Sequence, residues 1–280
     1  MSQAAIRERF LKSAETLDIR GSAIEIIRKG DGPPLLFLHG MDGLEAAAGL
    51  VDRLAETFTV FAPSHPGFGA SQLPEGITTV DDLGYFYLDL LDVLDLDTVT
   101  LVGLSLGGWI GLEMLVKEPR RVSRAVLGAP LGLRTGDRRA QRVADIFMLS
   151  AAEIEARMQT SPPEARPDPA TVSVETLERA ARNTAALALF GWSPYLHNPK
   201  LRQRLHRATP PALILWGEAD AIVPRDYAGN IVASLPHASL QVLPGCGHRI
   251  HIDAAEQAVQ AVVAFAGKSC SDKSSAAAAA

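Results

Sequence analysis

Cysteine is scarce in this chain, whose 280 residues include only Cys246 and Cys270. Two cysteines make no disulfide framework, and this pair is not a CxxC motif of the kind found in redox and zinc sites. A chain of this length can bury a core that is stable without covalent cross-links. We therefore expect a protein of a reducing compartment, the cytoplasm.

Long apolar runs and strong charge are missing as well. No stretch approaches the ~18 uncharged apolar residues of a membrane-spanning helix, and the first ten residues mix acids and bases instead of forming a secretory signal. The formal net charge is −5, which argues against binding to nucleic acid or an anionic membrane. The Ser- and Ala-rich residues 269–280 are interpreted as a disordered tail or expression remnant.

What the chain does have is an alternation of short apolar segments with longer helical patterns. Apolar strands separated by helices predict an α/β fold, in which a mostly parallel sheet is covered on both faces. Ligands of such sheets bind at the C-terminal ends of the strands. The expected strands are 23–28, 35–38, 59–62, 99–102, 122–127, 212–216 and 240–243, and the expected helices are 81–94, 106–117 and 256–265.

Residues 131–207 break this rhythm, because they contain no convincing strand. Helical patterns around 141–148 and 174–189 flank a Pro-rich patch at 161–169. A plain crossover between two strands needs far fewer residues. We therefore expect a helical cap at 131–207 over a core domain of 1–130 and 208–268. The alternative is a set of crossover helices packed on the sheet.

A candidate nucleophile, Ser105, lies in Gly103-Leu104-Ser105-Leu106-Gly107, between an expected strand and an expected helix. This is the G-x-S-x-G pattern, in which a sharp turn holds the serine hydroxyl clear of the backbone. The flanking glycines permit the close approach that the turn requires. The helix N-terminus favours the anion formed in acyl transfer. The alternative is a passive serine in a Gly-rich turn.

A serine hydroxyl is inert at neutral pH without a base. Of the seven histidines, His248 is favoured over His251, because it follows the last expected strand in a Gly-rich loop. Asp220 lies just past an expected strand and is the predicted acid, with Glu218 as its rival. The chain order of serine, acid and histidine fits this assignment. A helix cap or Asx turn is the alternative role for Asp220.

Two backbone N–H groups should stabilise the oxyanion of the tetrahedral intermediate. Leu106 follows the nucleophile, and Met41 lies in the loop after the strand at 35–38, so these residues form the predicted oxyanion hole. No metal site is predicted. Apolar cap residues are expected either to line the substrate pocket or to pack the cap onto the core, namely Phe147, Met148, Leu187, Phe190 and Trp192.

With these residues in place, the sequence resembles the α/β-hydrolase family, and within it the small capped esterase-like members. The resemblance spans residues 24–265. It implies an eight-stranded sheet, a helical cap, and acyl hydrolysis without a cofactor. Five motifs in family order carry it: His39-Gly40, Pro66-Gly67-Phe68-Gly69, Gly103-x-Ser105-x-Gly107-Gly108, Gly217-x-x-Asp220-x-x-Val223-Pro224 and Gly247-His248.

The chain departs from family patterns at three positions. Members often carry a structural Asp where this chain has Ser64. Members that cleave carbon–carbon bonds in ring-fission products tend to have Asn before the serine and Trp soon after the histidine, where this chain has Leu104 and Arg249. Dehalogenases and epoxide hydrolases of this fold use Asp as the nucleophile, and Ser105 counts against both.

These observations favour a carboxylesterase-like serine hydrolase, which cleaves an ester or related acyl bond through an acyl-enzyme. A carbon–carbon bond or lactone hydrolase with the same triad is the alternative. A non-catalytic ligand-binding module on this scaffold is a further one, because fold alone does not fix function. The expected partner is a small hydrophobic ester-like substrate, and the sequence is compatible with a homodimer.

Overall fold

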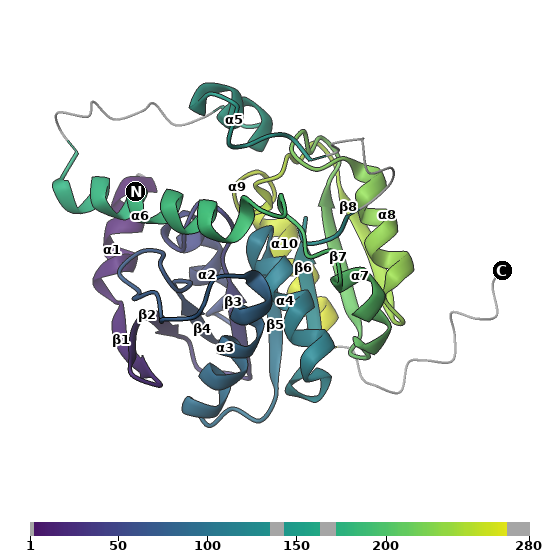
Figure 1. The fold of residues 1–280 in the computed structure, drawn as a ribbon, viewed down its shortest axis with the longest axis horizontal. Helices are drawn as coiled ribbons and strands as arrows, with labels where there is room; N and C mark the ends of the chain where they lie inside the picture. Colours follow the sequence, from purple (N-terminus) through teal and green to yellow (C-terminus); the bar gives the residue numbers. More distant parts are fainter. Residues whose placement is uncertain (1–2, 135–142, 163–171, 268–280) are drawn as a thin grey trace.

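The computed structural model describes residues 3–134, 143–162 and 172–267, so the expected tail lies outside the described residues. An eight-stranded sheet in the order β1-β2-β4-β3-β5-β6-β7-β8 forms its centre (Figure 1). β2 pairs antiparallel with both β1 and β4, and all later pairs are parallel. The strands are β1 (Glu15–Ile19), β2 (Ser22–Lys29), β3 (Pro34–Leu38), β4 (Thr59–Pro63), β5 (Val99–Leu104), β6 (Val122–Gly128), β7 (Ala212–Gly217) and β8 (Ala238–Leu243).

Burial along the strands follows their place in the sheet. Every residue of the central strands β5 and β7 is buried, as expected for parallel strands covered on both faces. These apolar segments are the ones that the sequence predicts. The edge strand β1 exposes most of its polar sequence ETLDI, and the sequence pattern does not predict it.

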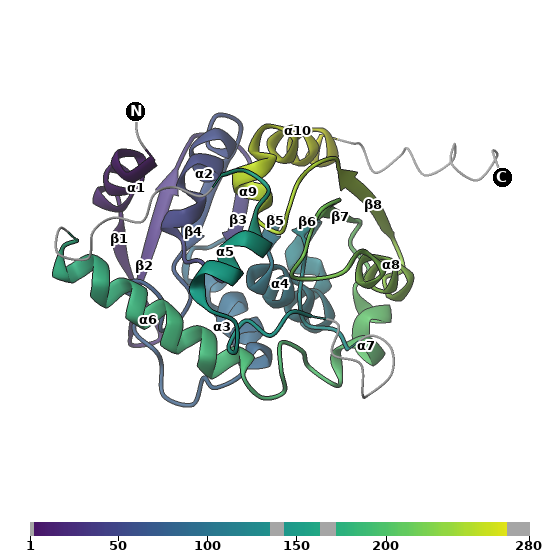
Figure 2. The same cartoon turned by 90° about the horizontal axis from the view of Figure 1, so that it is seen from above.

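Helices cover the sheet on both sides. Figure 2 shows α2 and α10 on one face and α3 and α4 on the other. In α4 every residue except the last is buried, because this helix packs on β5 and is flanked by α3 and η4. The elements outside the β6–β7 connection are α1 (Gln3–Lys12), η1 (Glu45–Ala47), α2 (Ala48–Leu54), α3 (Val80–Val93), α4 (Leu106–Lys117), η2 (Pro119–Arg121), α8 (Arg225–Ser234), α9 (Ile250–Asp253) and α10 (Ala255–Ala266).

The connection between β6 and β7 contains α5 (Ala151–Met158), α6 (Val174–Gly191), α7 (Leu201–Arg204) and η4 (Leu205–Arg207). Its described residues form no strand, only an isolated bridge between Gly132 and His197. α5 and α6 lie along the upper edge of the sheet in Figure 1, and from above α5 lies over the middle strands (Figure 2). α6 confirms the helix expected around 174–189.

The helix expected around 141–148 is wrong for its described part, because residues 143–148 form a bend and a turn and no helix. The Tyr195 hydroxyl accepts a 2.9 Å hydrogen bond from the Ile146 N–H and donates to the Ala144 carbonyl. It thereby satisfies backbone groups that a helix would otherwise pair. The next helix starts only after Ser150, which forms a capping box with Glu153. Residues 141, 142 and 163–169 of the predicted patterns lie outside the described residues.

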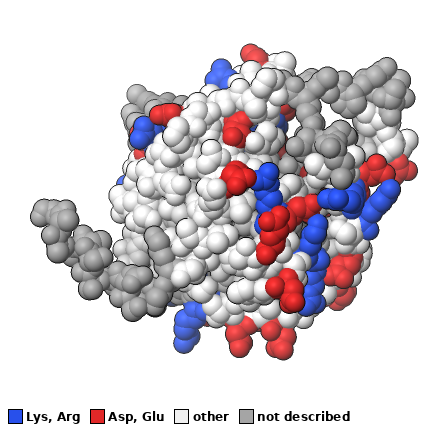
Figure 3. Space-filling view, turned by 180° about the vertical axis from the view of Figure 1, so that it is seen from behind, with Lys and Arg blue, Asp and Glu red and all other residues white. Residues whose placement is uncertain are grey.

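Charged side chains are unevenly spread over the surface. On the face shown in Figure 3, acidic and basic residues lie interspersed on one side, and the rest of that face is largely uncharged. Ion pairs join neighbouring elements, as in Asp52 of α2, which contacts Arg9 of α1 at 3.1 Å and Lys29 of β2 at 2.6 Å. None of the helices in the described ranges has the length and apolarity needed to span a bilayer.

Candidate active site

Ser105 lies on the turn between β5 and α4. Its backbone has φ 50° and ψ −108°, a conformation that non-glycine residues rarely adopt. Hydrogen bonds hold it there: its N–H donates to the Gly128 carbonyl at 2.8 Å, and its carbonyl accepts from the N–H groups of Trp109 at 3.0 Å and Leu131 at 3.2 Å. The strained turn predicted from the glycine pattern is therefore present.

Close backbone contacts explain the glycines on either side of the serine. A Cβ at Gly107 would lie 2.1 Å from the Leu38 carbonyl oxygen, and a Cβ at Gly103 would lie 2.5 Å from the Gly107 carbonyl oxygen. The first contact presses the start of α4 against the end of β3. The serine is thus placed beside the loop that follows β3.

The structure brings the three predicted triad residues together. His248 Nε2 lies 2.9 Å from Ser105 Oγ, and His248 Nδ1 lies 2.8 Å from Asp220 Oδ2. The side chains of His248 and Asp220 are each 1% exposed, so water barely competes for these contacts. A carboxylate can only accept, so Nδ1 carries the proton and Nε2 presents its lone pair to the serine hydroxyl.

Asp220 makes turn contacts as well as the contact with the histidine. Its Oδ1 accepts hydrogen bonds from the N–H groups of Ile222 at 2.9 Å and Val223 at 2.8 Å. The Asx-turn role and the triad position therefore coexist, one on each carboxylate oxygen. The rival Glu218 instead accepts from the Gly245 N–H at 3.1 Å and does not contact His248.

The loop that carries His248 is fixed on both sides. Gly217 and Gly247 approach closely, since a Cβ on Gly217 would lie 2.1 Å from the Gly247 carbonyl oxygen. Asp253 Oδ2 accepts the Gly247 N–H at 2.8 Å. The other candidate base, His251, has a buried Nε2 for which the described residues offer no hydrogen-bond partner, and burial lowers the pKa of its ring to about 4.

The two segments predicted to supply the oxyanion donors both lie next to the serine. Leu106 is the first residue of α4, and N–H groups of the first turn have no partner within their helix. Across from it, a Cβ on Gly40 would lie 3.6 Å from Ser105 Cβ, so the loop containing the buried Met41 faces the nucleophile. The arrangement leaves two main-chain segments beside one hydroxyl, as an oxyanion hole requires.

Cys246 lies close to His248 in sequence but has a different environment. The thiol is buried, its Sγ lies 3.3 Å from the Gly247 carbonyl oxygen, and burial raises its pKa to about 12. A thiol with so high a pKa stays protonated and is a poor nucleophile. Within the described ranges, no group of three or more His, Cys, Asp and Glu side chains is placed to hold a metal ion.

The five predicted pocket residues lie in different environments. Met148 and Trp192 are 77% and 59% exposed. Phe147 packs edge-to-face on Trp192 at 5.3 Å, and Leu187 is half-buried. Phe190 is buried and lines a cavity of about 280 Å³, together with Trp109 and residues 78–81 and 197–200. Ser105 does not line this cavity. The role of the five residues in substrate binding therefore stays a prediction.

The contacts of Arg249 are a feature that the sequence analysis did not predict. The residue follows His248 and forms bidentate ion pairs with Asp42, next to Met41, and with Glu155 of α5. Its backbone N–H also donates to the Met158 carbonyl at 2.7 Å. The only available signal was the arginine itself, where some relatives carry Trp.

Comparison with known proteins fits this geometry. The model of the alpha/beta hydrolase family matches residues 35–264. The chain belongs to the alpha/beta hydrolase family. The match includes the nucleophile turn, the acid and the histidine loop.

The relatives of this hydrolase described below are distant in sequence. An uncharacterised protein of Mycobacterium bovis is 29% identical, covering 78% of this chain and 71% of its own. A pimeloyl-[acyl-carrier protein] methyl ester esterase of Nitrosomonas europaea is 27% identical, covering 85% and 97%. A 2-hydroxy-6-oxo-6-phenylhexa-2,4-dienoate hydrolase of Burkholderia cepacia is 27% identical, covering 78% and 82%.

Solved structures share the fold of this hydrolase. A bacterial membrane phospholipase A superposes with a TM-score of 0.77 at 20% identity, covering 94% of this chain and 90% of its own. A meta-cleavage product hydrolase gives a TM-score of 0.75 at 20% identity, covering 92% and 100%. At this identity the likeness establishes the eight-stranded hydrolase fold, as the sequence predicts.

Proposed function

We propose that this hydrolase is a serine hydrolase that cleaves a carboxylic ester, or a related acyl bond, through an acyl-enzyme. The observation that carries the proposal is the pair of contacts made by His248, 2.9 Å to Ser105 Oγ and 2.8 Å to Asp220 Oδ2. Such an arrangement turns an inert alcohol into a nucleophile. The strained backbone at Ser105 supports the same role.

In the proposed reaction Ser105 Oγ attacks the carbonyl carbon of the ester while its proton passes to His248 Nε2. Asp220 stabilises the imidazolium, and the N–H groups of Leu106 and Met41 bind the oxyanion. The intermediate collapses, the carbon–oxygen bond to the alcohol breaks, and His248 returns the proton to the departing alcohol. A water deprotonated by His248 then attacks the acyl-serine, and the carboxylic acid leaves with Ser105 restored.

One of the named relatives supports ester chemistry. One relative that this chain matches along 97% of its length is a methyl ester esterase. The apolar residues of the predicted cap, such as Phe147 and Phe190, favour a small hydrophobic substrate. No metal or cofactor enters the proposed steps, because the triad and main-chain donors supply the nucleophile, base and oxyanion stabilisation.

Hydrolysis of a short p-nitrophenyl ester by wild type and by Ser105→Ala tests the proposal. We expect alanine at 105 to reduce turnover to near background, because no nucleophile remains. A fluorophosphonate probe should add its mass to Ser105 of the wild type and not to the variant. Cys246→Ala is the matched control and should keep both activities. Wild-type turnover by Ser105→Ala would contradict the assignment, and absence of labelling in the wild type would favour a ligand-binding module.

Carbon–carbon bond hydrolysis is the second candidate. It is favoured by the similarity to a 2-hydroxy-6-oxo-6-phenylhexa-2,4-dienoate hydrolase. Against it stand Leu104, and Arg249, whose guanidinium is bound by carboxylates instead of facing the serine. A panel containing esters, lactones and a ring-fission dienoate separates the reactions. We expect the highest kcat/KM on esters, and a higher value on the dienoate would make the second candidate correct.

A further inference from the structure

The guanidinium of Arg249 uses every hydrogen-bond donor it has. Arginine carries five N–H donors. Nε and Nη2 donate to Asp42 at 3.1 and 2.8 Å, Nη1 and Nη2 donate to Glu155 at 2.7 and 2.8 Å, and Nη1 also donates to Gln159 at 2.8 Å. A guanidinium whose donors are all bound by protein groups has none left for a substrate carboxylate. Its influence on the site must therefore act through the residues it binds.

Those residues belong to two segments that lie beside the loop of His248. Asp42 follows Met41 in the loop after β3, and Glu155 lies on α5. Arg249 itself follows His248, and its N–H donates to Met158 at the end of α5. The loop of the general base, the loop of a predicted oxyanion donor and α5 are thus joined at one guanidinium.

The guanidinium at the centre of the cluster is largely shielded from water. The side chains of Arg249, Asp42 and Glu155 are 11%, 22% and 32% exposed. Burial by itself would raise the pKa of Asp42, but the charge and hydrogen bonds of Arg249 outweigh it, and the pKa is lowered. Burial disfavours the charged arginine, yet Glu155 and Asp42 raise its pKa above the ordinary value. The Asp42 carboxylate and the Arg249 guanidinium therefore both stay charged at neutral pH.

We propose that Arg249 is a positioning residue, which holds the loop of Met41 at the distance from His248 and Ser105 that the oxyanion requires. This inference rests on the proposed function. The direction of a main-chain N–H depends on the conformation of its loop. A side-chain contact beside that N–H can therefore fix its direction. Asp42 is adjacent to Met41, and Arg249 donates hydrogen bonds to both of its carboxylate oxygens.

Four substitutions separate the arms of the cluster. Asp42→Asn removes the ion pair with the oxyanion loop, and Glu155→Gln removes the ion pair with α5. Arg249→Gln removes both ion pairs. Arg249→Lys keeps the positive charge but loses the bidentate geometry of the guanidinium. Arg121→Gln is the matched control. Arg121 makes three hydrogen bonds, to Asp92, Asp97 and Leu96, near the start of β5 and thus at the strand end opposite to Ser105.

We expect Arg249→Gln and Asp42→Asn each to lower kcat on the p-nitrophenyl ester by roughly 10- to 100-fold, because small misplacements of catalytic groups have effects of this order. KM should change little. The rate of fluorophosphonate labelling at Ser105 should fall in parallel, because the phosphonyl oxygen occupies the same hole. Arg249→Lys should recover only a small part, and Arg249→Gln with Asp42→Asn should be no slower than Arg249→Gln, as coupled residues require.

The inference is overturned if Arg249→Gln lowers the melting temperature about as much as Arg121→Gln does, while kcat and the labelling rate stay at wild-type values. A loss of kcat in Glu155→Gln as large as in Asp42→Asn would also overturn it, because Arg249 would then act through α5. If Arg249→Gln does not fold, Asp42→Asn decides the matter. Failure of the proposed function itself looks different, since the wild type would then neither hydrolyse the ester nor take up the probe.

Discussion

Ser64 Oγ donates a 2.6 Å hydrogen bond to Glu25 Oε1, and both residues are buried. Arg179 of α6 binds the same carboxylate in a bidentate pair at 2.8 and 2.6 Å. Burial would raise the pKa of Glu25, but Arg179 and Ser64 outweigh it and the pKa is lowered. This buried anion explains why the chain has serine where family members often carry aspartate: a second carboxylate would repel the first.

Replacing Ser64 by aspartate should therefore destabilise the fold. We expect a loss of about 3 kcal/mol or more in the free energy of unfolding, as for an uncompensated buried charge. Ser64→Ala, which removes one hydrogen bond, should cost about 1 kcal/mol. Urea denaturation measures both. In a Glu25→Gln background the penalty of aspartate at 64 should shrink, and an unchanged penalty would show that repulsion by Glu25 is not its cause.

The sequence predicts the features that local rules impose. The strained turn at Ser105 needs glycine on both sides, and buried parallel strands need continuous apolar residues, so both leave a readable pattern. The Arg249 cluster leaves none, because its partners Asp42 and Glu155 lie 207 and 94 positions away. Residues 143–148 carry a helical pattern, but the hydroxyl of the distant Tyr195 pairs with their backbone. Tertiary contacts of this kind cannot be read from spacing.

The backbone of Ser105 should store strain that glycine relieves. At φ 50° and ψ −108° a side chain is disfavoured, at a cost of about 1–3 kcal/mol. Ser105→Gly and Ser105→Ala both lose the contact with His248, so their difference isolates the backbone effect. We expect Ser105→Gly to be about 1 kcal/mol more stable than Ser105→Ala in chemical denaturation, after allowing for the greater freedom of unfolded glycine.

Ser239 in strand β8 provides the control for this comparison, because it is exposed and pairs in regular register with Leu213 of β7. In an ordinary strand conformation glycine is less favourable than alanine, so Ser239→Gly should be less stable than Ser239→Ala. If the order of glycine and alanine is the same at 105 as at 239, the turn at the nucleophile is not strained.

Stability should fall in mild acid, and the buried His39 should contribute to this fall together with the buried His65 and His251. Its Nδ1 donates to the Gly40 carbonyl at 2.7 Å, and its Nε2 accepts the His65 N–H at 3.0 Å, so the folded state holds a neutral ring. Burial lowers its pKa to about 4, below the unfolded value of about 6.5. Between these values the unfolded chain binds more protons, and the free energy of unfolding falls as the pH falls, by about 1.4 kcal/mol per pH unit for this group.

His39→Gln tests this linkage. We expect the variant to be less stable than wild type near pH 7.5, because the neutral ring's contacts are lost, but to show a shallower decline in urea-denaturation free energy between pH 6.5 and about 4.5. His237→Gln, at an exposed position, should keep the wild-type slope. The steep decline persisting in His39→Gln would assign the acid sensitivity to other groups.

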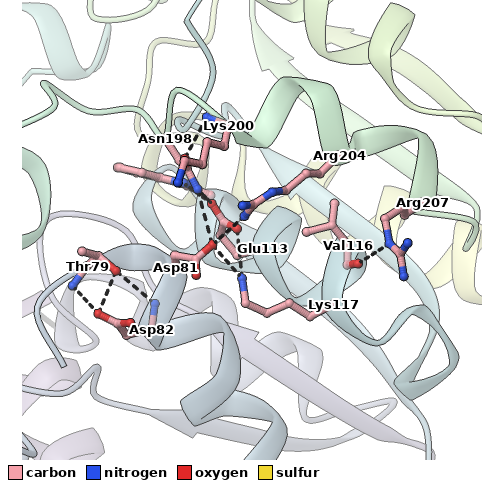
Figure 4. A network of polar contacts seen from close by, with 11 residues as sticks. Thr79, Asp81, Asp82, Glu113, Val116, Lys117, Asn198, Lys200, Arg204 and Arg207 are labelled. Carbon is pink, nitrogen blue, oxygen red and sulfur yellow. Dashed lines mark hydrogen bonds and ion pairs between the residues drawn. The ribbon is translucent and has the colours of Figure 1, made fainter. Parts of the chain in front are cut away.

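Lys117 is the last residue of α4, but its side chain is buried, and it should contribute strongly to stability. Its Nζ contacts Glu113 and Asp81 at 3.1 Å each (Figure 4), and the side chains of Lys117 and Glu113 are 6% and 0% exposed. Removing the lysine leaves Glu113 with two neutral donors, the Asn198 amide at 2.8 Å and the Trp109 indole at 3.3 Å, and with Asp81 as a neighbouring acid.

Lys117→Met should therefore cost about 3–5 kcal/mol, because it strands a buried carboxylate. Adding Glu113→Gln removes that charge, so the double variant should recover much of the loss. Thermal and urea denaturation of the two singles and the double give the coupling energy. Activity of the folded protein should stay near wild type, since Lys117 and Glu113 form their hydrogen bonds with residues outside the triad. A double variant no more stable than Lys117→Met would mean that lost packing of the lysine stem, and not the unpaired charge, sets the cost.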